Sequence, residues 1–252
     1  MNILLYTYIT ILGLIFGSFF NVVGLRVPEG QSIVKPRSHC TKCGHELSAI
    51  ELIPVFSYLF LRGKCKSCGV KISWIYPTFE LATGILFLLS AIFIGWTPEI
   101  IIALLLMSLL MIIFVSDIHY MIIPDKVLLF FAPLLLIGRI FIPLEPWWDA
   151  LLGAAVGFTL LLCIAYVSRG GMGGGDIKLF AVLGLALGWQ GVLLTFIFSS
   201  LYGTVVGIIG LLIGKVKRGE PFPFGPSIVL GTITTYFFGE AIVKWYLDMI
   251  IR

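Results

Sequence analysis

Two aspartates stand beside long apolar segments, where a charged side chain is costly unless it is solvated, paired or used. Asp117 directly follows the apolar run 101–116, and Asp176 ends the glycine-rich stretch Gly170-Gly-Met-Gly-Gly-Gly-Asp176 just before another apolar run. Two carboxylates in one site can share a proton, so that one acts as general base on water while the other acts as general acid. This chemistry needs no metal and no nucleophilic serine, and the chain has no G-x-S-x-G or H-E-x-x-H pattern.

Both acids also have simpler explanations. Asp117 and Asp176 can be solvated acids at a membrane interface, and Asp176 stands where it can cap the following helix. Asp125 follows the helix-breaking Pro124, so a helix N-cap is its expected primary role. Lys178 either tunes Asp176 or extends to the interface. Gly173 and Gly175 precede Asp176, and glycine permits unusual backbone angles and close backbone approach.

The elements that carry these acids are membrane helices. Hydrophobic residues make up 59% of the chain, charged residues only 12%, and the mean hydropathy is +1.08. The apolar runs have the length that crosses a hydrocarbon core of about 30 Å. The sequence predicts an all-α polytopic membrane protein with about eight transmembrane helices and a small cytoplasmic zinc-binding insert. The predicted spans are about 3–23, 74–95, 98–116, 126–142, 148–167, 177–189, 191–213 and 227–247, with residues 188–191 as the turn between the sixth and the seventh.

The basic residues predict the orientation of these spans. All but three of the 17 Lys and Arg residues fall in connections on one side, and only Arg139, Lys244 and Arg252 fall on the other. The positive-inside rule places the first side in the cytoplasm, together with Asp117 and Asp176. The net charge of +4 is therefore a topology signal and gives no reason to expect nucleic acid as a partner.

Four cysteines lie in the only long polar segment, residues 27–73. They form the pairs Cys40-Thr-Lys-Cys43 and Cys65-Lys-Ser-Cys68, with 21 residues between the pairs. Two C-x-x-C pairs on a small insert predict a closed four-cysteine zinc site, which is structural because it leaves no open position. Two disulfides or four free thiols are the alternatives, and disulfides conflict with a cytoplasmic location. The predicted domains are 1–26, the first transmembrane helix; 27–73, the insert; and 74–252, the transmembrane peptidase bundle.

The motifs together resemble those of the bacterial type IV prepilin peptidases, which are membrane aspartic proteases. The resemblance covers nearly the whole chain, and its most specific parts are the two C-x-x-C pairs and the Gly173-Gly-Gly-Asp176 form of the G-x-G-D motif. The further segments that carry it are Gly17-Ser-Phe-Phe-Asn21 with Arg26 and Pro28, Pro36-Arg-Ser38, Leu52-Ile-Pro-Val-Phe-Ser57, Tyr76-Pro-Thr-Phe-Glu80, Asp117 through Asp125, and Pro223-Phe-Gly-Pro226.

The resemblance implies an activity, substrates and a location. The enzyme would remove the basic leader of type IV prepilins or pseudopilins after a glycine, at the cytoplasmic face of the bacterial inner membrane, in type IV pilus, type II secretion or competence systems. Asp117 and Asp176 match the two catalytic aspartates, and Asp125 matches a further motif acid. Many members also methylate the new N-terminal residue with S-adenosylmethionine, and Asn21, Arg26 and Glu80 are candidates for that activity. The lipid bilayer is the other expected partner.

Two other classes of protein remain open at this point. In a polytopic transporter, Asp117 and Asp176 would relay protons or bind cations. Such a protein would be expected to show inverted repeats and broken helices near the membrane midplane, and no convincing repeat is present. A zinc-bearing membrane scaffold would have no catalysis at all.

Overall fold

A computed structural model describes residues 2–169, 171–214 and 223–250. Gly170 of the glycine-rich stretch and the basic residues Lys215, Lys217, Arg218 and Arg252 lie outside the described residues. Within them all secondary structure elements are helices, as predicted. They are α1 (Asn2–Arg26), α2 (Phe56–Phe60), α3 (Ile75–Phe93), α4 (Glu99–Tyr120), α5 (Asp125–Phe141), α6 (Asp149–Val167), α7 (Gly174–Leu212) and α8 (Gly225–Ile250).

Six of the described helices are long and apolar enough to cross a membrane, namely α1, α3, α4, α6, α7 and α8. The predicted fourth span corresponds to α5, which has only 17 residues. The predicted sixth and seventh spans are the two parts of α7, a helix of 39 residues that is broken at Gly188. The protein is therefore a multi-pass helical membrane protein.

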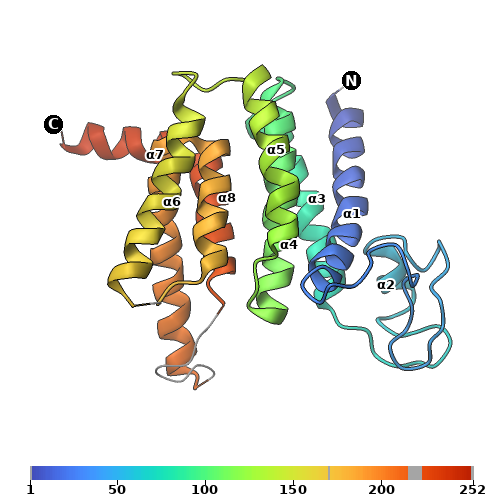
Figure 1. Ribbon diagram of the computed structural model, residues 1–252. Helices are drawn as coiled ribbons and strands as arrows, with labels where there is room; N and C mark the ends of the chain where they lie inside the picture. The colour runs from blue at the N-terminus through green and yellow to red at the C-terminus, as the bar shows by residue number, and fades with distance from the viewer. Residues whose placement is uncertain (1, 170, 215–222, 251–252) are drawn as a thin grey trace. The chain divides into compact units, whose positions relative to one another are not determined.

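The chain divides into two compact units, Met1–Ile100 and Ile101–Arg252. In the first unit α1 and α3 run antiparallel, side by side (Figure 1). Glycines on this face allow the two backbones to approach closely, because a Cβ on Gly13 would lie 2.9 Å from the Cα of Gly84 and one on Gly17 would lie 2.9 Å from the Cα of Glu80. The long polar segment connects α1 to α3 and contains only the short helix α2.

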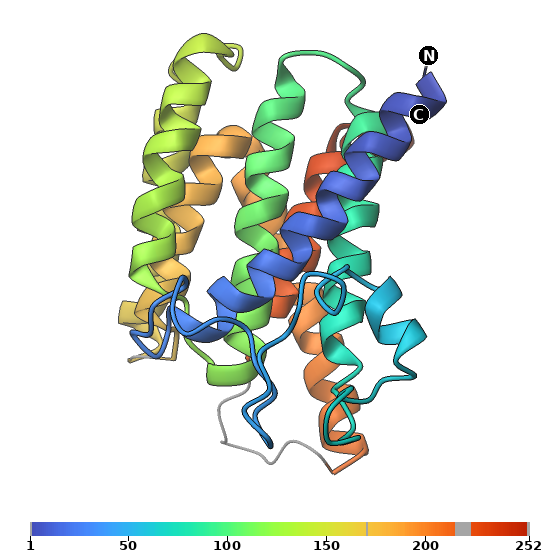
Figure 2. The same cartoon turned by 90° about the vertical axis from the view of Figure 1, so that its right-hand side faces the viewer.

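In the second unit α7 packs against α5, α6 and α8, and α4 is buried along most of its length. Gly188 adopts φ 73° and ψ 179°, which reverses the chain between a first limb (174–187) and a second limb (189–212), as the view in Figure 2 shows. The rings of Phe180 and Phe196, eight residues before and eight after Gly188, lie 6.3 Å apart. The two limbs therefore run antiparallel, and residues equally far before and after Gly188 lie at the same level.

Asp149, in the first turn of α6, stabilises this break. The Trp189 N–H donates to Asp149 Oδ1 at 3.3 Å, which satisfies one of the free N–H groups that open the second limb. A Cβ on Gly188 would collide with the same carboxylate. Glycine is required here both by the positive φ and by the space that Asp149 occupies.

Candidate active site

Asp117 lies in the last turn of α4 and is 5% exposed. Its Oδ2 accepts a hydrogen bond of 2.7 Å from the backbone N–H of Gly225, the first residue of α8. A Cβ on Gly225 would lie only 2.6 Å from this oxygen, so the carboxylate fits only because position 225 is glycine. The helix N-terminus also supplies a favourable dipole for the carboxylate, which the C-terminal end of α4 does not.

Asp176 lies in the first turn of α7, as the third residue of that helix. The N-cap is Gly173, so the expectation that Asp176 is itself the N-cap is wrong. Its backbone N–H donates to the Gly173 carbonyl at 3.1 Å. This places the Asp176 side chain over the cap, and a Cβ on Gly173 would lie 2.9 Å from Asp176 Oδ2.

The glycines of the G-x-G-D motif serve close packing in this structure. Gly173 leaves room for the Asp176 carboxylate, and a Cβ on Gly175 would lie 2.9 Å from Cβ of Ile123, in the connection between α4 and α5. Close approach was one of the two glycine roles expected from the sequence. The other, a positive φ, is not found at the cap, where Gly173 has φ −68°.

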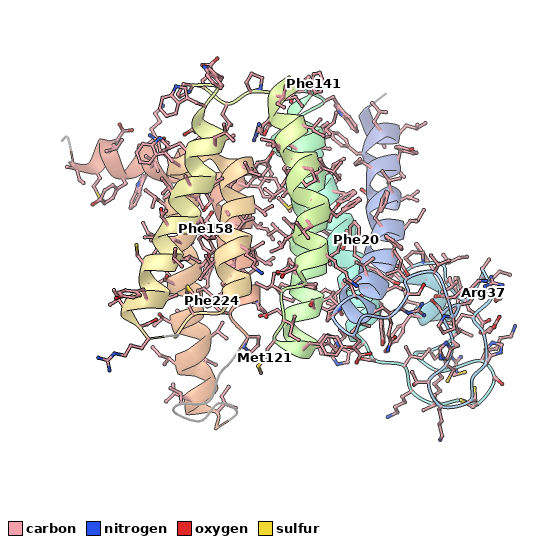
Figure 3. The ribbon with its side chains drawn as sticks, viewed as in Figure 1. Phe20, Arg37, Met121, Phe141, Phe158 and Phe224 are labelled. Carbon is pink, nitrogen blue, oxygen red and sulfur yellow. The ribbon has the colours of Figure 1, made fainter. Side chains whose placement is uncertain are left out.

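Asp117 and Asp176 line one pocket of about 830 Å³. The two carboxylates therefore face one common space. Met121 and Phe224 also line the pocket, and Figure 3 shows both near the same ends of the unit's helices. The structure thus brings together two acids that are 59 positions apart in the sequence.

The second limb of α7 forms one wall of this pocket. Asp176 and Ser200 lie twelve residues before and after Gly188, which places them at the same level of the antiparallel limbs. The wall continues beyond that level, on one helix face with small and apolar side chains. Its residues are Ser200, Gly203, Thr204, Gly207, Ile208 and Leu211, over a length of about 16 Å.

Asp125 and Lys178 form an ion pair away from this pocket. Lys178 Nζ donates to both carboxylate oxygens of Asp125, at 2.8 and 2.7 Å, and both side chains are more than half exposed. The N-cap of α5 is Pro124 with no side-chain cap, so the expected capping role of Asp125 is wrong. Lys178 pairs with Asp125, which links the start of α5 to the first turn of α7.

The four cysteines of the insert form one cluster, with their sulfur atoms all within 4.8 Å of one another. The Sγ atoms of Cys40 and Cys68 are 3.8 Å apart and those of Cys43 and Cys65 are 3.9 Å apart. These separations exceed an S–S bond and match the edge of about 3.8 Å expected for a tetrahedron with Zn–S bonds of about 2.3 Å. His39 and His45, which flank the first pair in the sequence, are not members of the cluster.

The two halves of the cluster repeat one backbone motif. The N–H of Cys40 donates to the His45 carbonyl and the N–H of Gly44 to the Cys40 carbonyl, both at 2.9 Å. Cys65, Val70 and Gly69 make the same two bonds at the same distance. Gly44 and Gly69 have φ of 72° and 69°, which glycine adopts without strain. Each C-x-x-C-G segment is therefore a knuckle that turns its sulfurs to a common centre.

The four thiols of the cluster affect one another's ionisation. Backbone N–H groups of Cys43 and Lys42 directed at its sulfur lower the pKa of Cys40 to about 6. The Val70 N–H favours the Cys68 thiolate, but burial and the three neighbouring sulfurs together raise the pKa of Cys68 to about 11. Four thiolates this close repel one another unless a metal ion compensates their charge. The cluster can hold a structural metal.

The candidates for methyl transfer all lie in the first unit, and each makes a hydrogen bond to the backbone. Asn21 Nδ2 donates to the Tyr76 carbonyl at 3.2 Å, and Glu80 Oε2 accepts from the Val55 N–H at 2.7 Å. Arg26 donates to the carbonyls of Ser32 and Pro36 at 3.1 and 2.7 Å. These contacts tie the insert and the two long helices together.

Two residues that support the second unit were not among the predicted site residues. Gly225 holds Asp117, and its signal in the sequence is the Pro223-Phe-Gly-Pro226 motif that contributes to the family resemblance. Asp149 holds the break in α7 that sets Asp176 level with Ser200. In the sequence, Asp149 is an acid at the start of an apolar run. Acids are common at helix N-termini, so this position alone does not distinguish it.

The fold and the pocket define a multi-pass helical membrane protein with a paired-carboxylate site. Family models agree with this class: the Bacterial Peptidase A24 N-terminal domain matches residues 11–94, and the Type IV leader peptidase family matches residues 104–208. The chain belongs to the type IV leader peptidase family. Membership in this family does not favour the transporter or the scaffold.

Curated relatives support the same family. The chain is 46% identical over 239 residues to a prepilin leader peptidase/N-methyltransferase of Bacillus subtilis, covering 95% of this chain and 96% of the relative. It is 35% identical over 272 residues to a protein of the same name from Pseudomonas aeruginosa, covering 94% and 92%. An Aeromonas salmonicida protein of that name is 33% identical over 283 residues, covering 98% and 96%. No solved structure matches the chain.

Proposed function

We propose that this protein removes the leader peptide of type IV prepilins or pseudopilins, with Asp117 and Asp176 as the catalytic pair. The observation that carries the proposal is that both carboxylates line one pocket although they come from different helices. Two carboxylates that face one pocket favour a state in which the pair holds a single proton. Asp125 and Lys178 act outside the pocket, as a pair that fixes α5 against α7. Gly173 leaves room for the Asp176 carboxylate, and Gly175 leaves room for Ile123.

The reaction needs only these two groups and water. The ionised carboxylate accepts a proton from water as the hydroxide adds to the carbonyl carbon of the residue before the scissile bond. The protonated carboxyl gives its proton to the leaving nitrogen, the C–N bond breaks, and the leader leaves as a carboxylic acid while the mature protein keeps a free amine. The pocket wall from Ser200 to Leu211 is the surface along which the substrate chain lies beside the pair.

We further propose that the active site faces the cytoplasm, since the basic residues fall on that side of the spans. The metal in the cysteine cluster is zinc, which supplies folding energy to the insert and takes no part in cleavage. Methylation of the new amine, the second activity in the relatives' names, uses S-adenosylmethionine as donor. Asn21, Arg26 and Glu80 remain the candidates for methyl transfer, and they also tie the insert to its helices.

A cleavage assay tests the catalytic pair. Purified protein in lipid is mixed with a prepilin-like substrate, and product masses are read with and without S-adenosylmethionine. Wild type should release the leader, and Asp117→Asn and Asp176→Asn should release none while remaining folded. A mass gain of one methylene that appears only with the methyl donor would establish methylation. Cleavage by either variant at the wild-type rate would overturn the assignment of the pair.

A further inference from the structure

Ten consecutive uncharged residues, Leu52–Leu61, interrupt the otherwise polar insert. They read Leu-Ile-Pro-Val-Phe-Ser-Tyr-Leu-Phe-Leu and contain α2. An apolar run of this length is too short to span a bilayer and is typical of a buried core helix or an interfacial, re-entrant segment. The structure favours the interfacial segment over the buried core helix, because α2 has no buried residue.

Five large apolar side chains of this segment are exposed. Phe60 is 83% exposed and Leu59 is 64% exposed, and Phe56, Ile53 and Leu52 are exposed as well. Large apolar side chains gathered in this way mark an interaction surface. The position and charge of the segment indicate which partner covers these exposed side chains.

The depth of the segment follows from its contact with α3. Trp74 and Trp96 flank this helix, and tryptophan is enriched at the two membrane interfaces. The 19 residues of α3 measure about 28 Å, close to the thickness of a hydrocarbon core. Ile75, the first residue of α3, therefore lies near one boundary of that core.

Glu80 holds the segment against the second turn of α3. Its carboxylate accepts the Val55 N–H at 2.7 Å, and Glu80 lies five residues into α3, which is about 7.5 Å along the helix from Ile75. The neighbouring helix supports the same depth, because Gly17 of α1 packs against Glu80 and the Ser18 side chain contacts its carboxyl group. Val55 has a φ of 63°, which a β-branched residue adopts only under constraint, so this position is held by the structure around it.

Basic residues follow the apolar segment directly. Arg62, Lys64, Lys66 and Lys71 are exposed, and the segment itself carries no acid. A basic stretch beside an apolar surface favours the phosphate groups of anionic lipids. The depth of the segment, the exposure of its apolar side chains and the positive charge beside it all favour the lipid bilayer as the partner.

We propose that residues 52–61 re-enter the bilayer as an interfacial segment, with Phe56, Leu59 and Phe60 in the acyl boundary and Arg62 and Lys64 at the lipid headgroups. Glu80 is the residue that fixes its depth. The insert is then anchored to the membrane at a third place besides α1 and α3, which holds the cysteine cluster next to the lipid surface. This proposal concerns lipid contact and does not depend on the catalytic activity.

Photo-crosslinking in the full-length protein tests this directly. The phenylalanine analogue p-benzoylphenylalanine is placed at Phe60 or at Phe56, and the protein is reconstituted in vesicles of phosphatidylethanolamine and phosphatidylglycerol. The matched control carries it at Glu46, an exposed polar position of the same insert. After irradiation, mass spectrometry identifies the adduct, and metal content confirms that the insert is folded.

Lipid should be the main adduct at positions 60 and 56 and should be absent at position 46. Combining the analogue at position 60 with Glu80→Ala should reduce the lipid adduct, because the segment is no longer held at depth. The proposal is overturned if position 60 crosslinks to a second copy of the chain in place of lipid, if it forms no adduct with lipid, or if position 46 yields as much lipid adduct as position 60.

Discussion

The backbone N–H of Gly225 donates a 2.7 Å hydrogen bond to Oδ2 of Asp117, across 108 positions of sequence. This bond fixes one oxygen of a carboxylate that is 95% removed from solvent and leaves the rest of the group facing the pocket. Any side chain at position 225 would crowd that oxygen, because its Cβ would lie 2.6 Å away.

Gly225→Ala should therefore abolish or strongly reduce leader cleavage. The added Cβ would lie 2.6 Å from Asp117 Oδ2 and would push the carboxylate out of position, and a displacement of about 1 Å can lower a rate about 100-fold. The control is Gly174→Ala, where a Cβ meets nothing within 4 Å. Equal initial rates for the two variants at matched protein levels would show that Gly225 does not position Asp117.

The pair formed by Asp125 and Lys178 should be supportive and not catalytic. Both side chains are more than half exposed, and an exposed ion pair contributes about 1 kcal/mol or less. Asp125→Asn and Lys178→Met should each lower the cleavage rate only severalfold. The exchange variant Asp125→Lys with Lys178→Asp should recover most of the loss, whereas a complete loss in Asp125→Asn alone would give this acid a direct catalytic role.

Gly188→Ala should destabilise the second unit. The residue would have to adopt φ 73°, at a cost of about 1–3 kcal/mol, and its Cβ would displace Asp149 from the start of the second limb. Thermal unfolding in detergent should show a lower midpoint, and Asp149→Ala should lower it by a smaller amount because only the capping bond is lost. A midpoint unchanged in Gly188→Ala would mean that the break in α7 does not depend on glycine.

Cys65→Ser should remove the metal from the insert. Cys65 is the buried member of the cluster, and a three-sulfur site binds zinc less tightly than a closed four-sulfur site. Elemental analysis should find one zinc per wild-type chain and much less in the variant. Cys163→Ser is the matched control, since Cys163 lies outside the cluster, and it should keep the metal. Full zinc content in Cys65→Ser would contradict the four-cysteine site.

Glu51 should make the stability of the insert depend on pH in the acid range. Hydrogen bonds from the side chain and backbone of Ser48, and then the contact with His45, lower the pKa of Glu51 from 4.5 to about 2. A carboxylate with a lowered pKa stabilises the folded state above its unfolded pKa, and this contribution is lost as the pH falls through the folded value. The stabilisation should be complete above about pH 4.5 and should disappear towards pH 2.

Comparing wild type with Glu51→Gln tests this dependence. The difference in melting temperature between the two proteins should be constant from neutral pH down to about pH 5 and should shrink below it. Ser48→Ala should reduce the same difference, because Ser48 provides the main hydrogen bonds. A difference that grows on acidification would have the wrong sign for a lowered pKa.

Local sequence determined the helices and the metal cluster. Apolar runs of membrane-spanning length predict helices wherever they occur, because a lipid environment leaves the backbone few other ways to satisfy its hydrogen bonds. The two C-x-x-C-G segments likewise carry their own turn geometry, so the knuckles were predictable from spacing alone. The ends of helices are less predictable: the sequence places Asp125 and Asp176 at the N-caps, but the N-caps in the structure are Pro124 and Gly173.

Only the tertiary structure determined which residues distant in the sequence contact one another. The sequence marked Asp117 and Asp176 as candidates by their shared depth, but their common pocket depends on the reversal at Gly188 and on packing between helices distant in the chain. Three contacts have no local signature: Lys178 with Asp125, Gly225 with Asp117, and Val55 with Glu80. Each joins segments whose spacing in the sequence is arbitrary. Periodicity and composition determine elements, whereas long-range contacts depend on how the elements pack in three dimensions.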